Sequence, residues 1–248
     1  VTRWDAWLGC GLEWCALQHA WCWGDARGPL EAGEVSRTAR ELIDESFRAR
    51  ARGSSAWWWA WVVPSRVGPW LDRLATDLAL AGEAAPEGII LNLELAEPGG
   101  SRGGGRPAWN DAPGVAAAAA RLVAGVRAAW PGEVWITTHG LLKPRQPWGE
   151  FSDFDGVLPQ AYNPSCTYEA GFVSRCVASY DAAFPEPGQI APLLGANSTP
   201  AGCMARFARE AEECRPAAVG WWAWTGIEPS PAKRAVVAAC GVKAPPPQ

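Results

Sequence analysis

The chain has 248 residues, 22 basic and 26 acidic side chains, a net charge of -4 and 48% hydrophobic residues. This length suits one large hydrophobic core better than two small domains. The mildly acidic balance, without a run of Lys or Arg, argues against a nucleic-acid partner, and no apolar stretch reaches the ~18 residues of a membrane span. We therefore expect neither nucleic acid nor a membrane as partner.

Short apolar, β-branched or aromatic runs alternate with longer helical stretches, a pattern typical of βα units around a parallel sheet. The expected strands are, in chain order, residues 17–23, 57–63, 88–95, 134–139, 156–162, 189–195 and 219–225. Residues 4–9 are the candidate for an eighth strand, although residues 11–16 are too few for a crossover helix, so the start of the barrel is expected to be irregular. The predicted fold is an α/β, (β/α)8 TIM-like barrel, a single domain over residues 1–243, followed by a Pro-rich tail or linker stub at 244–248.

The intervening segments have helix-forming composition with a turn signal at one end. The expected helices are residues 34–52, 69–81, 113–130, 168–184, 200–214 and 231–240. Thr199-Pro200 and Ser230-Pro231 each predict an N-cap residue followed by Pro at the first helical position.

Eight Cys form an even number but show no CxxC pair, and there are only two His. No zinc site of ordinary spacing is therefore expected, and we predict no metal and no cofactor. Disulfides stay open, above all among Cys10, Cys15 and Cys22, whereas Cys176 and Cys214 are expected to pack as small hydrophobic side chains in helices. The compartment stays undecided, with secretion or a cell-wall location favoured.

The strand at 88–95 is the most informative segment for function. With a period of two, Ile90, Asn92 and Glu94 share one face, and four aliphatic residues share the other. The wholly apolar face is expected to point to the helices, which turns Asn92 and Glu94 into the barrel at the end where barrel active sites lie. A carboxylate there needs partners or protonation, so Glu94 is either a catalytic group or a paired structural glutamate.

Polar and aromatic residues also close the other predicted strands. They are His139, Gln160, Tyr162, Asn197, Trp222 and Trp224. Trp rings fill cores, and they also form platforms on which the apolar faces of sugar rings stack. With 17 Trp in the chain, both interpretations stay open for each one, but their recurrence at successive strand ends favours a polar and aromatic mouth.

Three segments resemble glycoside hydrolase motifs. Glu87-Gly88-Ile89-Ile90-Leu91-Asn92-Leu93-Glu94 resembles the D-G-x-D-x-D-x-E of family 18, whose final Glu is the general acid. Residues 158–163 are similar to that group's M-x-Y-D/N, and residues 218–224 to its G-V-M-x-W.

The departures from this pattern widen the resemblance. Ile90 and Asn92 stand where family 18 has Asp. The Asn-x-Glu pair resembles the family 85 endo-β-N-acetylglucosaminidases, and Gln160 resembles a residue of the family 25 lysozymes. The chain thus resembles the wider group of retaining N-acetylhexosaminidase-like barrels.

This resemblance implies hydrolysis of β-linked N-acetylhexosamine glycans, such as peptidoglycan, chitin-like polymers or N-glycans. In the implied route the sugar's own 2-acetamido oxygen attacks the anomeric carbon, while Glu94 protonates the leaving oxygen and then activates water. Asn92 would orient the acetamido group and Tyr162 would donate to it. The expected substrate-binding residues are Gln160, Trp222, Trp224, His139, Asn197 and Glu97.

Two alternatives stay open. One is a two-carboxylate enzyme in which Glu97, Asp111 or Asp25 is the partner of Glu94. The other is a catalytically inactive carbohydrate-binding barrel that keeps the Trp-lined cleft. The oligomeric state is not predicted.

Overall fold

A computed structural model describes most of the chain from residue 55 to residue 240. The described residues are 14–20 (backbone only), 43–44, 46–48, 50–51, 55–93, 109, 114–161, 166–167, 169–186, 188–195, 199–214, 219–222 and 230–240. They belong to two compact units. The first unit holds residues 13–136 and 144–155, and the second holds residues 1–12, 137–143 and 156–248.

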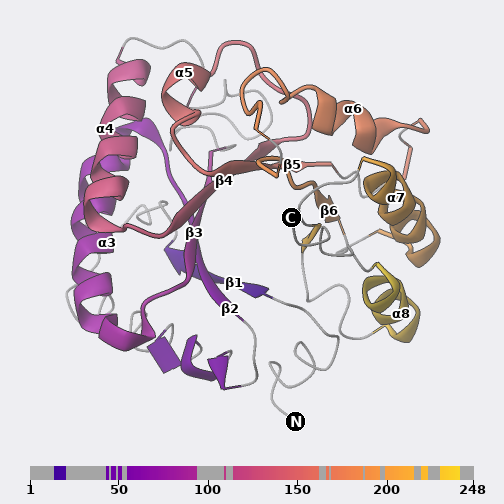
Figure 1. Ribbon diagram of the computed structural model, residues 1–248, viewed down its shortest axis with the longest axis horizontal. Coiled ribbons are helices and arrows are strands. Elements are labelled where there is room, and N and C mark those ends of the chain that lie inside the picture. The colour runs from indigo at the N-terminus through magenta and orange to yellow at the C-terminus, as the bar shows by residue number, and fades with distance from the viewer. Residues whose placement is uncertain are drawn as a thin grey trace. The chain divides into compact units, whose positions relative to one another are not determined.

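The first unit is built from parallel strands and the helices that follow them. Its strands are β1 (Trp14–Ala20), β2 (Ser55–Trp61), β3 (Gly88–Asn92) and the first part of β4 (Glu133–His139); its helices are α3 (Val67–Ala81), α4 (Val115–Ala129), the short α5 (Trp148–Phe151) and two 3-10 turns, η1 (Pro64–Arg66) and η2 (Gly82–Ala84). β1 pairs parallel with β2, and β2 parallel with β3. Helices α3 and α4 lie side by side (Figure 1).

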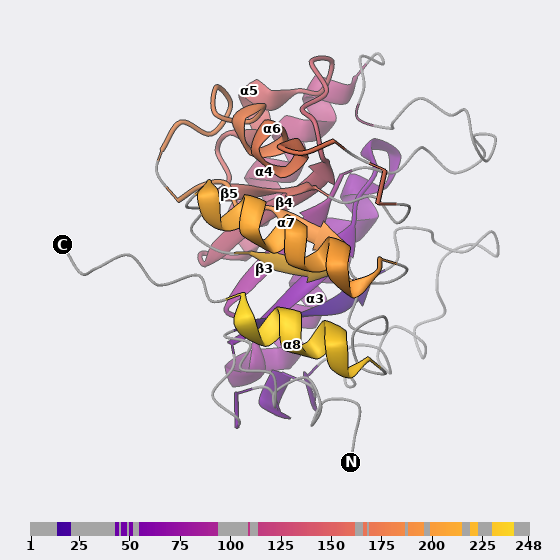
Figure 2. The same ribbon diagram turned by 90° about the vertical axis from the view of Figure 1, so that its right-hand side faces the viewer.

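The second unit repeats this arrangement. It holds the end of β4, then β5 (Gly156–Gln160), α6 (Phe172–Ala178), β6 (Leu193–Gly195), α7 (Ala201–Glu213), β7 (Gly220–Trp222) and α8 (Pro231–Ala239). β5 pairs parallel with β6, and β6 parallel with β7. Helices α7 and α8 pack side by side, as Figure 2 shows.

The chain therefore has the α/β class that its sequence predicts, but not a closed barrel in its described part. The sheet runs from β1 to β7 in chain order, which gives seven strands among the described residues. The proposed eighth strand at 4–9 lies outside the described residues, and no described helix has the length and apolarity of a membrane span.

Each of the seven predicted strands has a counterpart among the described residues, with shifted ends. β1 begins at Trp14 and not at residue 17. β6 begins only at Leu193, because Pro192 has no N–H to donate to a ladder, and Ile190 before it forms an isolated parallel bridge with Val157.

Helix starts follow local turn chemistry. Gly114 and Gly171, with φ of 86° and 78°, precede α4 and α6, so these helices begin later than predicted. The Ser230-Pro231 start is confirmed: Ser230 accepts a hydrogen bond from the Lys233 amide, and Pro231 is the first helical residue. The Thr199-Pro200 prediction is wrong by one residue, because Pro200 is extended and itself occupies the N-cap position.

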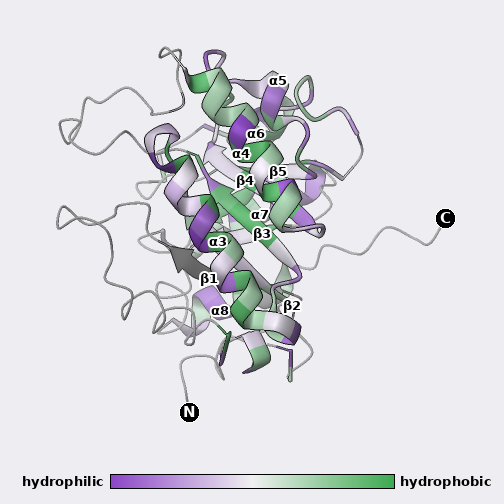
Figure 3. Cartoon of the chain, turned by 90° about the vertical axis from the view of Figure 1, so that its left-hand side faces the viewer, coloured by the Kyte–Doolittle hydropathy of each residue, from purple (hydrophilic) through white to green (hydrophobic). Residues whose placement is uncertain are grey.

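The absence of a side chain at Gly88 of β3 makes room for the indole ring of Trp57 on the neighbouring strand β2. Figure 3 shows the hydrophobic colouring of β3, all five residues of which are buried. Trp57 pairs in register with Gly88, and its six-membered ring lies where a Cβ on Gly88 would be. Gly88 is therefore required by the neighbouring side chain and not by its backbone angles.

We predict that Gly88→Ala lowers the free energy of unfolding by about 1–3 kcal/mol, because overpacking at this point forces the indole or β3 to move. Chemical denaturation measures the effect. The control is the same substitution in a Trp57→Leu variant, where Gly88→Ala should lower the free energy of unfolding clearly less than in the wild type. An equal cost in both backgrounds would contradict the contact.

Candidate active site

The orientation of β3 places Asn92 on the face that turns away from the flanking helix. Trp58 Nε1 donates to Ser46 Oγ at 3.2 Å, so the face that carries Trp58 and its register partner Ile89 turns toward the helical segment containing Ser46. Alternation puts Ile90 and Asn92 on the opposite face. Asn92 is only 3% exposed. This is the orientation that the sequence pattern predicts for Asn92; Glu94 lies outside the described residues, and its place stays a prediction.

The backbone at the end of β3 is held by a short chain of contacts. The Val62 amide donates to the Asn92 carbonyl at 3.1 Å, and the Val62 carbonyl accepts from Trp109 Nε1 at 2.8 Å. Trp109 is fully buried, with its ring edge-on to Phe151 at 5.2 Å between centroids. The indole of Trp109 is thus attached to the backbone at the carboxyl end of β2.

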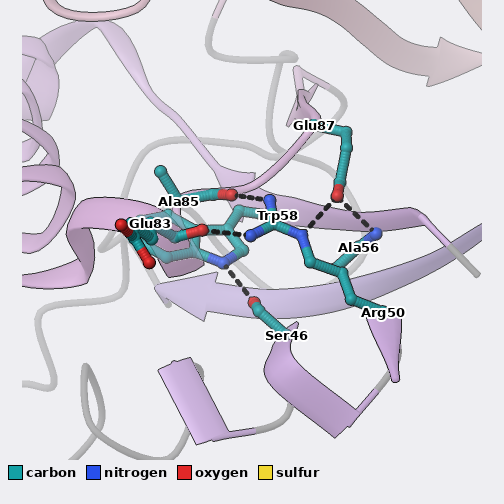
Figure 4. Close-up of polar contacts among 7 residues, drawn as sticks. All are labelled: Ser46, Arg50, Ala56, Trp58, Glu83, Ala85 and Glu87. Atoms are coloured by element: carbon teal, nitrogen blue, oxygen red, sulfur yellow. Dashed lines mark hydrogen bonds and ion pairs between the residues drawn. The ribbon is translucent and has the colours of Figure 1, made fainter. Parts of the chain in front are cut away.

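Glu87, the first residue of the glycosidase-like motif, has a structural role. Its carboxylate accepts from the Ala56 amide at 2.6 Å and pairs with the Arg50 guanidinium (Figure 4). Arg50 also donates to the carbonyls of Glu83 and Ala85. This clamp fixes the start of β3 against the start of β2, at the end of the strands opposite to Asn92.

In the second unit, a tyrosine hydroxyl binds the backbone of the last residue of β4. Tyr180 is fully buried, and its hydroxyl donates to the His139 carbonyl at 2.6 Å and is hydrogen-bonded to the Thr138 side chain. Burial is the main cause that raises the pKa of Tyr180 above its usual value, so the hydroxyl stays protonated as a donor. The backbone that carries His139 is thereby fixed from the helix side.

Gly140 brings the ends of β4 and β5 together. A Cβ at Gly140 would lie 2.8 Å from the Gln160 carbonyl oxygen and 3.1 Å from Cys176 Sγ. Two of the predicted substrate-binding residues, His139 and Gln160, therefore lie at adjoining strand ends of this unit. An imidazole and a carboxamide each offer a donor and an acceptor, as a sugar hydroxyl requires.

His139 is held in its neutral form. Burial, and secondly the positive charge of Lys143, lower the pKa of its imidazole below 6.5. Its Nε2 is buried and has no hydrogen-bond partner in the part of the chain described. Protonation would bury a donor without an acceptor, and this favours the uncharged ring at neutral pH.

Among the described cysteines, Cys166 and Cys203 form a disulfide that the sequence did not predict. Cys166, in the connection after β5, is bonded to Cys203 in the first turn of α7, with their Cα atoms 6.1 Å apart. Cys176 is a free, fully buried thiol in a hydrophobic cluster, as predicted, and burial raises its pKa to about 12. Cys214 is also free but only partly buried; its Sγ lies 3.4 Å from Ser174 Oγ.

The other predicted site residues are not placed by the structure. Outside the described residues lie Glu94, Glu97, Tyr162, Asn197 and Trp224, and also Asp25, Asp111, Cys10 and Cys22. For Trp222 and Cys15 only the backbone is described, and Trp222 ends β7. Sequence reasoning missed Tyr180 and the disulfide, since neither gives a local signal.

Comparison with solved structures shows the fold. A GH18 chitinase from Cycas revoluta in complex with (GlcNAc)3 is similar with a TM-score of 0.62 at 12% identity, covering 96% of this chain and 94% of the chitinase. A chitinase from Rhizomucor miehei has a TM-score of 0.61 at 11% identity over 82% and 87% of the two chains. The fold is that of glycoside hydrolases. A psychrophilic family 10 endo-β-1,4-xylanase is similar with a TM-score of 0.52 at 12% identity, over 78% and 79%.

The sequence itself has no counterpart in two further comparisons: no family model and no curated protein matches it. At 11–12% sequence identity, a shared fold does not establish a shared reaction, so the chemistry of this chain has to be argued from its own residues.

We predict that His139 titrates below pH 6.5 in the folded chain, because burial and Lys143 disfavour its cation. The stability that the neutral ring contributes is present above pH 6.5 and is lost as the pH falls through the lowered pKa. NMR of the imidazole protons measures this directly, because the chain has only two His, and His139→Gln assigns the signal. Lys143→Gln should raise the pKa. A wild-type midpoint at or above 6.5 would contradict the assignment.

Proposed function

We propose that this protein is a glycoside hydrolase that cleaves β-linked N-acetylhexosamine-containing glycans, with Glu94 as general acid and base. The observation that carries the proposal is the orientation of β3. The apolar face of β3, which carries Ile89, turns toward the helical segment that contains Ser46, and Asn92 lies on the other face. A strand continued by two residues would put Glu94 on the same face as Asn92. Chitinase-like fold and motif resemblance support the same reaction class.

The proposed mechanism is substrate-assisted. Glu94 protonates the leaving glycosidic oxygen, the 2-acetamido oxygen attacks the anomeric carbon, and the carboxylate of Glu94 then activates water against the oxazolinium ion. In a strand extended as far as Glu94, Asn92 would lie about 6 to 7 Å from it, and we assign to Asn92 the orientation of the acetamido group. Tyr162 donates a hydrogen bond to the acetamido oxygen.

The remaining residues are assigned to the substrate. Neutral His139 and Gln160, at adjoining strand ends, would bind hydroxyl or amide groups of the glycan. Trp222 and Trp224 would stack on sugar rings, as indoles do. Asn197 and Glu97 complete the proposed set. Peptidoglycan, chitin-like polymers and N-glycans all carry the acetamido group that the mechanism needs.

One observation favours a second candidate function. Ile90 is buried on the Asn92 face, where the resembled motif has a carboxylate. With an aliphatic side chain there, Glu94 has no acidic partner two residues before Asn92, and the chain could bind glycans without cleaving them. Binding to chitin oligomers without any cleaved product in mass spectra would establish this alternative.

We predict that Glu94→Gln abolishes glycan hydrolysis while the melting temperature stays near that of the wild type, because the amide keeps the shape of the carboxyl but cannot transfer a proton. A digestion screen of peptidoglycan, chitin oligomers and N-glycans, with mass-spectrometric product analysis, supplies the substrate and the rate. Parental activity in Glu94→Gln would remove Glu94 as the acid.

Asn92 separates the two enzymatic mechanisms. In the substrate-assisted route, Asn92→Ala should lower turnover on N-acetylated substrates about 10²–10³-fold, as the loss of one preorganised hydrogen bond to developing charge does elsewhere. Asn92→Asp is the informative control and should retain or raise turnover. In a two-carboxylate enzyme, substitution of Glu97, Asp111 or Asp25 would instead be the damaging change, and a covalent glycosyl-enzyme could be trapped. A trapped adduct with parental activity in Asn92→Ala would exclude substrate assistance.

A further inference from the structure

Val62, which directly follows β2, uses both of its backbone polar groups. Its amide donates to the Asn92 carbonyl at 3.1 Å, and its carbonyl accepts from Trp109 Nε1 at 2.8 Å. Val62 is fully buried, so a backbone group that lost its partner there would have no water to replace it. The indole of Trp109 thus binds the same residue that holds the backbone of Asn92.

The indole of Trp109 is itself held in one place. Trp109 is fully buried, and its ring lies edge-on to Phe151 of α5 at 5.2 Å between centroids. Phe151 is fully buried as well and stacks on Phe154 at 6.4 Å between centroids. All of these residues belong to the first unit. Because such an interior is close-packed, the ring cannot swing away from Val62 without displacing its neighbours.

The backbone of Asn92 determines where its carboxamide begins. The carbonyl carbon and the side chain are both attached to the same Cα, so a carbonyl fixed against Val62 also fixes the origin of the side chain. β3 ends at Asn92, which is 3% exposed. A group that orients a reacting atom has to be held closely, since a misplacement of about 1 Å can cost ~10²-fold in rate.

We propose that Trp109 is a positioning residue of the active site: through Val62, its indole N–H holds Asn92 in the place from which the carboxamide orients the acetamido group of the substrate. The catalytic consequence rests on the proposed function, which assigns that task to Asn92. The restraint on Asn92 is independent of any activity and can be measured without substrate. Trp109 acts through Val62 and need not touch the glycan.

Trp58 is the matched comparison for a tryptophan that only fills the core. It is fully buried too, and its Nε1 donates to Ser46 Oγ at 3.2 Å, on the helix side of the same strand β2. Trp109→Phe and Trp58→Phe each keep an aromatic ring and remove one buried indole donor. Only the first removes a donor from the residue that holds Asn92.

The test has one readout without substrate and one with it. Hydrogen exchange followed by NMR should show the Val62 amide exchanging about tenfold faster or more in Trp109→Phe, and not in Trp58→Phe. On the N-acetylglucosamine oligomer that the wild type cleaves, Trp109→Phe should lower kcat about tenfold or more with little change in KM, because Asn92 is assigned to the transition state. In an Asn92→Ala background the same substitution should change kcat less than about twofold, since the group that Trp109 positions is gone.

The outcomes separate the two proposals. An equal loss of kcat with and without Asn92, or equal effects of Trp109→Phe and Trp58→Phe on exchange at Val62, overturns the positioning role. A wild-type chain that cleaves no glycan refutes the proposed function and the catalytic consequence, and the restraint then stands or falls with the Val62 amide alone. If Trp109→Phe does not fold, Phe151→Leu keeps the indole N–H but removes its ring contact. It should change both readouts in the same direction, and no change in either would overturn the proposal.

Discussion

The register between β2 and β3 is the constraint on which the candidate site depends. Three contacts along the pair fix it. They are the Ala56 amide on the Glu87 carboxylate at the start, the indole of Trp57 over Gly88, and the Val62 amide on the Asn92 carbonyl at the end. Because side chains alternate along a strand, a slip of one residue would turn Asn92 toward the helix and Leu91 into its place. The chemistry proposed at the carboxyl end of the strand is therefore set partly by residues at its amino end.

Sequence reasoning predicted what depends on local periodicity. One wholly aliphatic face between residues 88 and 95 was enough to orient Asn92, and the alternation of strands and helices was enough for the parallel α/β class. It failed where a contact joins distant residues. Nothing near Glu87 indicates that Arg50 binds it, and Cys166 could have paired with any of seven other cysteines. The sequence analysis also did not take account of Pro192, which has no N–H to donate, and β6 begins only after it, at Leu193.

The comparisons separate fold from chemistry. A chitinase and a xylanase share this fold with the chain at 12% identity each, so the scaffold is compatible with more than one sugar and more than one set of catalytic groups. On one face of β3 in this chain, a buried Ile90 precedes a buried Asn92. The proposed pair of the Asn92 amide and the Glu94 carboxyl would suit a substrate that brings its own nucleophile, and this is why the acetamido group is central to the proposal.

The disulfide has a consequence for the integrity of the chain. Between Cys166 and Cys203 lie all of α6 and β6, which makes this part of the second unit a covalently closed ring. A protease that cuts once within the ring leaves both pieces joined, so the nicked molecule keeps its mass apart from one added water. The two pieces would separate only after the disulfide is reduced.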